Sequence, residues 1–202
     1  MIFNQFKLGE ISTIKQKGGT PDKLNAEYWS GDLPWLTSGE TSNMFITETK
    51  NHISKEAADS KNLEIVPKGS LVIARSGQGC TRGQTSLCLI DTYVNDGLIT
   101  IIPDNTKVLP RYLLYNLIHR YDEIRQLSDS NSCRGNINAT ILSNLNIMLP
   151  ELEVQKNIVN LVSKFDDLIL INNRINDYLS EFRFNKNSNI LSLKSFSIRF
   201  WH

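Results

Sequence analysis

Arginine, glutamine and glycine gather in one short stretch, Arg75-Ser76-Gly77-Gln78-Gly79-Cys80-Thr81-Arg82-Gly83-Gln84. Arginine and glutamine carry paired hydrogen-bonding groups that fit guanine and adenine edges, and arginine also binds phosphate oxygens. No Asp or Glu occurs from Ile65 to Ile90. The stretch lacks the Gly-Lys-Ser/Thr ending of a nucleotide-binding P-loop. It predicts nucleic-acid contacts, with a solvated hairpin loop as the alternative. The candidate residues are Arg75, Ser76, Gln78, Arg82 and Gln84.

Two further polar loops carry similar side chains. In Lys15-Gln16-Lys17-Gly18-Gly19-Thr20-Pro21, two glycines allow close backbone approach and two lysines can bind phosphate oxygens. A plain solvated turn is the alternative there. Residues 129–136 add another arginine, another glycine and amide side chains. These loops predict backbone-positioning contacts from Lys15, Lys17, Gly19 and Thr20, and further base or phosphate contacts from Arg134 and Asn136.

A cysteine nucleophile is the alternative from another functional class. Cys80 lies between two arginines, a setting that lowers a thiol pKa, and His52 or His119 could serve as its base. No local Cys/His signature supports such a hydrolase, so we favour the non-catalytic interpretation. Cys80, Cys88 and Cys133 form no CxxC pair and no zinc-ligand spacing with histidine, which predicts reduced thiols and no metal site.

Charge and hydropathy restrict the class of protein. The net charge is +1, and residues 1–149 contain as many acidic as basic side chains. Binding to nucleic acid must therefore use local acid-free stretches or a partner that supplies positive charge. The N-terminus MIFNQFKLGE has no signal-peptide core, and no run of 18 apolar residues occurs. We expect a cytoplasmic protein that does not contact membranes.

The patterning over residues 1–149 predicts one mixed α/β domain, in fold class α+β. Trp29 and Trp35 are predicted to anchor its core, with base stacking as the alternative. Strands are expected around Trp35 and at 71–74, 86–90, 98–102 and 144–149, and helices at 53–58, from Pro110 and at 138–143.

Residues 150–184 predict one long helix. Pro150 suits the start of a helix, and no Gly or Pro follows it. Mostly apolar side chains then recur alternately four and three residues apart, which is the spacing of a coiled-coil core. We call these positions the apolar stripe: Val154, Ile158, Leu161, Phe165, Leu168, Asn172, Ile175 and Leu179.

A helix of this length is too long to bury its apolar stripe on one small domain, so it predicts a partner helix. Asn172 is the polar member, and a single Asn at a core position fixes register and partner number. One alternative is a helix packed on its own domain, and another is a coiled-coil adaptor that binds no DNA. Residues 185–202 are expected to form a tail, either disordered or truncated.

Four motifs occur in a fixed order. They are Lys7-Leu8-Gly9-Glu10 before Gly19-Thr20-Pro21, Leu33-Pro34-Trp35-Leu36-Thr37-Ser38-Gly39-Glu40, Gly69-Ser70-Leu71-Val72-Ile73-Ala74-Arg75-Ser76-Gly77, and Leu149-Pro150-Glu151-Leu152-Glu153-Val154-Gln155-Lys156-Asn157-Ile158-Val159. In this order they resemble one target-recognition domain plus one conserved helix of a type I restriction-modification specificity (S) subunit. The resemblance covers residues 1 to about 180.

The resemblance implies a non-catalytic module that contacts about half of a split double-stranded DNA target. It further implies that the long helix docks adenine-N6 methyltransferase (M) subunits, which bind S-adenosylmethionine, in a complex that also holds the restriction (R) subunit. No cofactor is expected on this chain. A full S subunit carries two such units, and no internal repeat is found here. Two copies could pair their helices antiparallel as a homodimer, and helix length would then set the half-site spacing.

The sequence departs from the family pattern at two places. Asn95-Asp96-Gly97 replaces the usual Asn-Gln before the late strand, and the tail 185–202 does not continue the conserved helix.

Overall fold

The computed structural model describes residues 2–77, 79–129 and 135–197, with side chains in the last helix described up to 179 except 173 and 177. The chain divides into two compact units, Met1–Ile158 and Val159–His202. Helices and strands are mixed along the first unit, and a long helix follows, so the predicted α+β class is confirmed.

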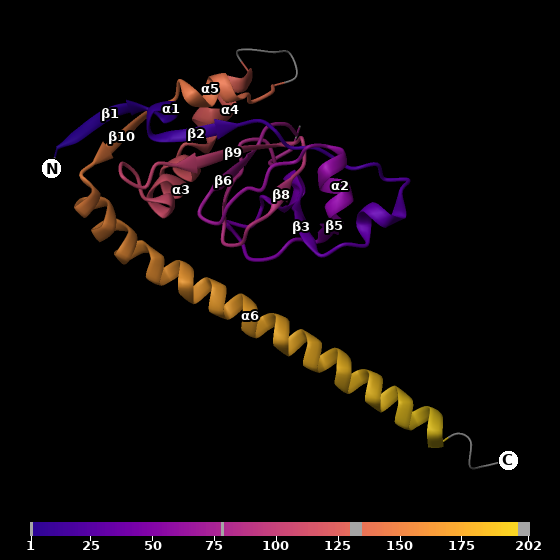
Figure 1. Ribbon diagram of the computed structural model, residues 1–202. Helices are drawn as coiled ribbons and strands as arrows, with labels where there is room; N and C mark the ends of the chain where they lie inside the picture. The colour runs from indigo at the N-terminus through magenta and orange to yellow at the C-terminus, as the bar shows by residue number, and fades with distance from the viewer. Residues whose placement is uncertain (1, 78, 130–134, 198–202) are drawn as a thin grey trace. The chain divides into compact units, whose positions relative to one another are not determined.

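A five-stranded sheet lies at the centre of the first unit (Figure 1). Its strands, in spatial order, are β2 (Ser12–Lys15), β9 (Leu98–Pro103), β6 (Leu71–Ala74), β7 (Thr85–Cys88) and β4 (Phe45–Ile46). Strands β6 and β7 form an antiparallel pair, so residues 75–77 and 79–84 belong to a hairpin loop between two fully buried strands. The predicted strand at 71–74 is confirmed.

A three-stranded sheet packs on the central one. It consists of β5 (Asn51–Ile53), β3 (Leu33–Leu36) and β8 (Tyr93–Val94), and β3 pairs in parallel with β8. Trp35 is only 4% exposed and packs with Ile53 and with α2 (Lys55–Ser60), so its prediction as a core anchor is confirmed. Ser54 caps α2 through a hydrogen bond from Ala57 N.

Short elements from the two ends of the first unit lie side by side. Strand β1 (Phe3–Lys7) pairs antiparallel with β10 (Asn146–Pro150), and α1 (Leu8–Ile11) contacts α5 (Ala139–Ser143). The predicted segments 138–143 and 144–149 therefore form the helix and strand expected. The opening segment contributes two strands and a helical turn.

Helix α3 (Pro110–His119) covers part of the central sheet, and a second helix follows it. Helix α3 contacts β7 and buries the side chains of Leu113, Leu114 and Leu117 completely. It begins at Pro110, as predicted. Helix α4 (Tyr121–Asp129) follows at once and was not predicted. The remaining 3-10 turns are η1 (Ala26–Trp29) and η2 (Ser38–Glu40).

The last helix, α6, runs from Leu152 to Ser197 (Figure 1). Its 46 residues correspond to roughly 69 Å at 1.5 Å per residue. Pro150 belongs to β10, so the helix begins two residues later than predicted. It also continues through 185–197, where a disordered or truncated tail was expected, because no Gly or Pro interrupts it.

The apolar stripe is exposed along most of the described helix. Val154 and Ile158 are half-buried. Phe165 is 65% exposed and Leu168 is 58% exposed, and Leu161, Asn172, Ile175 and Leu179 are exposed as well. None of the helices in the described ranges combines the length and hydropathy that a membrane span needs.

A buried glutamine fixes the start of α6. Gln155 is fully buried, and its Nε2 donates 3.0 Å hydrogen bonds to the carbonyl oxygens of Lys107 and Pro150. Its Oε1 accepts a 3.0 Å bond from Leu109 N. One side chain therefore satisfies backbone groups of β10 and of the segment before α3, groups that would cost free energy if left buried and unpaired.

Substitution of Gln155 by leucine should strongly destabilise the first unit. Leucine fills a similar volume but leaves three backbone groups unpaired, and we expect the free energy of unfolding to fall by about 3 kcal/mol. Urea denaturation followed by tryptophan fluorescence measures this change. The exposed neighbour Asn157 provides the control, since Asn157→Ala removes none of these bonds. An equal loss in both variants would contradict the assigned role of Gln155.

Candidate nucleic-acid interface

Side chains of helix α4 bond to the backbone of the hairpin loop after β6. Tyr121 Oη donates a 2.7 Å hydrogen bond to the Cys80 carbonyl oxygen. Arg125 Nη1 donates to the carbonyl oxygens of Gly79 at 2.8 Å and Arg82 at 3.1 Å, and to Tyr121 Oη at 2.9 Å. Two side chains of one helix thus bind three carbonyls of the loop, so they fix the conformation in which the loop presents its other groups.

Arg82 lies beneath this loop and does not face solvent. It is 6% exposed, and its Nη2 lies 2.7 Å from Asp129 Oδ1. Gly135 has φ +51°, and a Cβ there would overlap the Arg82 guanidinium. Within the described residues the buried Arg82 Nε has no hydrogen-bond partner. The geometry therefore favours a structural role for Arg82 over the predicted DNA contact.

Arg75 connects three loops. Its Nε donates to Asn136 Oδ1 at 3.3 Å, and its Nη1 donates to the Asp96 carbonyl oxygen at 3.2 Å. Its backbone N–H bonds to Gly97 O, and its carbonyl oxygen accepts from Ile137 N. The predicted site residues Arg75 and Asn136 are thus in direct contact, although they lie 61 positions apart in the sequence.

The turn after β2 joins the same group of loops. Gln16 Oε1 accepts a 3.3 Å bond from Ala139 N, and Thr20 Oγ1 donates a 3.1 Å bond to Asp96 Oδ1. Gly19 N bonds to Val94 O. A Cβ on Gly18 would lie 1.9 Å from the Asn95 carbonyl oxygen, so the close backbone approach predicted for this turn is present. We call residues 15–20, 75–77, 95–97 and 136–138 the loop surface.

Acidic groups offset much of the positive charge on the loop surface. Lys15 Nζ and Lys17 Nζ lie 2.7 and 2.6 Å from the two carboxylate oxygens of Glu64. Hydrogen bonds and charge from both lysines lower the pKa of Glu64 to about 2. Because the carboxylate stays ionised down to that pH, both ion pairs are intact at neutral pH and are lost only as pH falls toward 2.

The other predicted residues have varied surroundings. Ser76 is exposed beside Arg75. Gln84 is half-buried, and its Oε1 accepts a 3.2 Å bond from Thr41 Oγ1. Gln78 and Arg134 lie outside the described residues. Sequence reasoning did not identify Glu64, Gln16 or the α4 side chains, and only the mixed charge of residues 1–149 signalled that lysines could be paired.

Nothing in the described geometry builds a cysteine hydrolase. Cys80 is exposed and lines a pocket of about 500 Å³ whose lining contains no histidine. His52 lies in β5 and His119 at the end of α3. Burial raises the pKa of the Cys88 thiol to about 12, which leaves it protonated at neutral pH. Among the described residues no group of three His, Cys, Asp or Glu is placed to hold a metal ion.

Comparison with known proteins identifies relatives over most of the chain. The family model described as "Type I restriction modification DNA specificity domain" matches residues 3–181. The type I restriction enzyme MjaIX specificity subunit of Methanocaldococcus jannaschii is 28% identical over 179 residues, which cover 86% of this chain and 39% of the relative. The EcoR124I/EcoR124II specificity subunit of Escherichia coli is 25% identical over 164 residues, covering 80% and 40%.

Solved structures share the fold. A chain of a type I R-M system superposes with a TM-score of 0.64 at 21% identity, covering 83% of this chain and 39% of that one. The HsdS subunit of Thermoanaerobacter tengcongensis superposes with a TM-score of 0.61 at 19% identity, covering 83% and 38%. The chain therefore spans about two fifths of the length of the relatives it matches.

Removing the Arg125 side chain should loosen the hairpin loop. Arg125→Ala deletes the bonds to Gly79, Arg82 and Tyr121, and we expect amide hydrogen exchange in residues 76–84 to accelerate about tenfold. Hydrogen-exchange mass spectrometry on the full chain measures this rate. Arg125→Lys keeps the charge but not the planar guanidinium, so its exchange rate should lie between those of the wild type and Arg125→Ala. Arg174→Ala on α6 is the control and should exchange at the wild-type rate. If Arg125→Ala also exchanges at that rate, α4 does not hold the loop.

Proposed function

The chain belongs to the type I restriction modification DNA specificity domain family, and from that membership we propose that it is the DNA-specificity component of a type I restriction-modification complex. In this proposal it contacts half of a bipartite double-stranded target, as one mixed domain followed by one long helix would. It positions methyltransferase and restriction subunits and catalyses no reaction itself. S-adenosylmethionine binds to the methyltransferase, and this chain needs no cofactor.

The observation that carries this proposal is the meeting of three loops at Arg75, which a fourth loop joins through Asp96. Arg75 bonds to the Asn95-Asp96-Gly97 turn and to Asn136, while Thr20 bonds to Asp96. Guanidinium, amide and hydroxyl groups are thereby held close together on loops of a buried sheet, and these are the groups that bind base edges and phosphates. Rigid presentation of such groups lowers the entropy lost on binding.

Charge supports the involvement of a partner in DNA binding. Glu64 offsets Lys15 and Lys17, and Asp129 offsets Arg82. Since phosphate neutralisation dominates DNA affinity, a nearly neutral domain binds weakly alone. We propose that the methyltransferase subunit supplies the missing positive charge and that the loop surface supplies sequence discrimination.

The exposed apolar stripe supports a docking role for α6. Phe165 and Leu168 are more than half exposed, as are other members of the stripe. Water contact at so many large apolar side chains is unfavourable, so the stripe requires a covering helix. In the proposed complex that cover is a second copy of α6, with Asn172 fixing an antiparallel register, and the methyltransferase subunits dock along the paired helices.

Freeing the two lysines should strengthen DNA binding. Glu64→Gln removes the carboxylate that pairs Lys15 and Lys17, so both ammonium groups become available to phosphates. We expect tighter binding to duplex DNA and, at about 0.9 per phosphate contact, a salt dependence of log K steeper by about 2. Fluorescence anisotropy on a labelled duplex over a series of salt concentrations measures both quantities.

The control variant removes the same charge elsewhere. Glu48 is exposed on the segment between β4 and β5, and Glu48→Gln should leave the slope as it is in the wild type. In the same assay Arg75→Ala should reduce the preference for the target sequence over random DNA. Equal slopes in Glu64→Gln and wild type, together with unchanged preference in Arg75→Ala, would overturn the assignment of the loop surface to DNA.

A charge on the apolar stripe should break the assembly. Phe165→Glu places a carboxylate where a partner helix packs, and we expect association to weaken about thirtyfold, as for loss of an interface hot spot. Sedimentation velocity on the full chain, alone and with a type I methyltransferase subunit from the same cells, measures this association. Lys164→Ala, its polar neighbour on α6, should associate normally. A variant that still binds both itself and the methyltransferase would place the interface elsewhere.

A further inference from the structure

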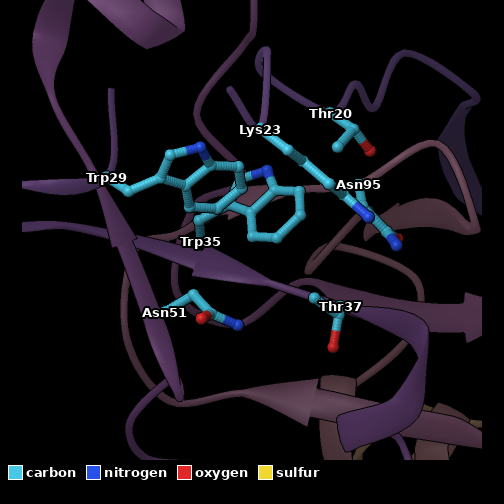
Figure 2. A pocket seen from close by; sticks show the side chains of 7 residues that line it. All are labelled: Thr20, Lys23, Trp29, Trp35, Thr37, Asn51 and Asn95. Carbon is cyan, nitrogen blue, oxygen red and sulfur yellow. The ribbon is translucent and has the colours of Figure 1, made fainter. Parts of the chain in front are cut away.

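A pocket of about 440 Å³ opens beside the loop surface (Figure 2). Trp29 and Trp35 form one wall, with ring centroids 4.9 Å apart at an interplanar angle of 82°. Lys23, Thr20 and Asn95 lie on the opposite side of the view, and Asn51 and Thr37 lie below the rings. The volume falls within the roughly 300–1,000 Å³ of ligand pockets.

The aromatic wall is held in place by the backbone of residues 19–22. Trp35 Nε1 donates a 3.1 Å hydrogen bond to the Gly19 carbonyl oxygen, and Trp29 Nε1 donates a 3.0 Å bond to the Asp22 carbonyl oxygen. Both indole N–H groups are therefore used in fixing the rings. Trp35 is only 4% exposed and lies behind Trp29, so the half-buried ring of Trp29 supplies the apolar surface that suits a flat aromatic ligand.

Polar groups on the other sides retain free hydrogen-bonding capacity. In the described part of the chain, the Lys23 ammonium and the Asn51 amide make no side-chain hydrogen bond, and Lys23 has no ion pair. Asn95 uses only its Oδ1, which accepts from Gly97 N. An amide offers donors and an acceptor to a base edge, and an ammonium offers charge to a phosphate.

The pocket is continuous with the loop surface. Thr20 lines the pocket and bonds to Asp96, whose carbonyl oxygen binds Arg75. Asn95 lines the pocket and begins the Asn95-Asp96-Gly97 turn. A DNA strand that contacts Arg75 would therefore pass beside the pocket mouth.

We propose that this pocket binds a single unstacked nucleotide, with the base against Trp29 and a phosphate on Lys23. The Asn51 and Asn95 amides bind the edge of the base. The inference rests on the proposed DNA-specificity function and adds a step to it, because a base that leaves the duplex would be held in this pocket and not in a groove. The cost of unpairing is offset by stacking and by the amide contacts.

Binding to a duplex with one unpaired, bulged nucleotide tests the proposal. The full chain should bind the bulged duplex about tenfold more tightly than the fully paired duplex, since stacking and amide contacts are gained only by an extrahelical base. Asn51→Ala and Lys23→Ala should each remove most of this difference. Asn105→Ala and Lys68→Ala make matched changes at exposed positions outside the pocket lining and should retain it.

Intrinsic tryptophan fluorescence of a Trp201→Phe variant, which keeps only Trp29 and Trp35, locates the nucleotide. Titration with dAMP, dGMP, dCMP or dTMP, excited at the red edge of the indole band, should give saturable quenching that deoxyribose 5-phosphate alone does not give. Quenching by the bulged duplex but by no free nucleotide also supports the pocket, and shows that the strand is needed to deliver the base.

Two results would overturn the pocket assignment. Equal affinity for bulged and paired duplexes, or a bulge preference that survives in both Asn51→Ala and Lys23→Ala, excludes an unstacked base at this position. Either result leaves the proposed function standing, provided that paired target DNA is still bound with sequence preference. Absence of sequence preference in the wild type would instead contradict the proposed function. Quenching by free nucleotides would still be observed in that case, because it depends on the pocket alone.

Discussion

Side chains that satisfy the backbone groups of distant loops hold the loops of this protein in place. Tyr121 and Arg125 bind three carbonyls of the hairpin loop, and Arg75 binds the turn at Asp96. Gln155 does the same where α6 begins. Loops contain no repeating ladder, so each buried carbonyl or amide needs an individual partner. The same bonds that satisfy the backbone also bring the candidate contact residues together.

Paired charges give the loop surface its electrostatic character. Lys15 and Lys17 share Glu64, so the surface presents hydrogen-bonding groups without a strong positive field. A strongly basic surface would bind any DNA through its phosphates, whereas a weakly charged one depends more on base contacts. Near-neutrality is thus consistent with a specificity component that acts inside a larger complex. The proposed nucleotide pocket lined by Trp29 and Lys23 would add contacts to the edge of an unpaired base.

The long helix has a different physical requirement. Its apolar stripe is exposed over many turns, and Asn172 is exposed among apolar neighbours. Apolar positions supply association energy, and the polar one restricts which pairing is allowed. Because rise per residue is fixed in a helix, its length converts directly into a distance between whatever it joins. This property suits a spacer between two halves of a DNA target.

The sequence by itself determined the local features of this protein. The strand Leu71–Ala74, the start of α3 at Pro110 and the long helix after Pro150 were predicted correctly, because strand runs, helix starts and helical periodicity depend on residues a few positions apart. Tertiary structure alone decided which candidate side chains are free to contact DNA and which are occupied by other parts of the chain. Arg82 and Arg75 carry the same chemistry in one loop, yet Arg82 is buried against Asp129 and Arg75 is half-buried beside Asn136. Lys17 is paired by Glu64, 47 positions away, a partner that no local pattern reveals. Availability depends on contacts between distant segments, which are set by packing and not by spacing.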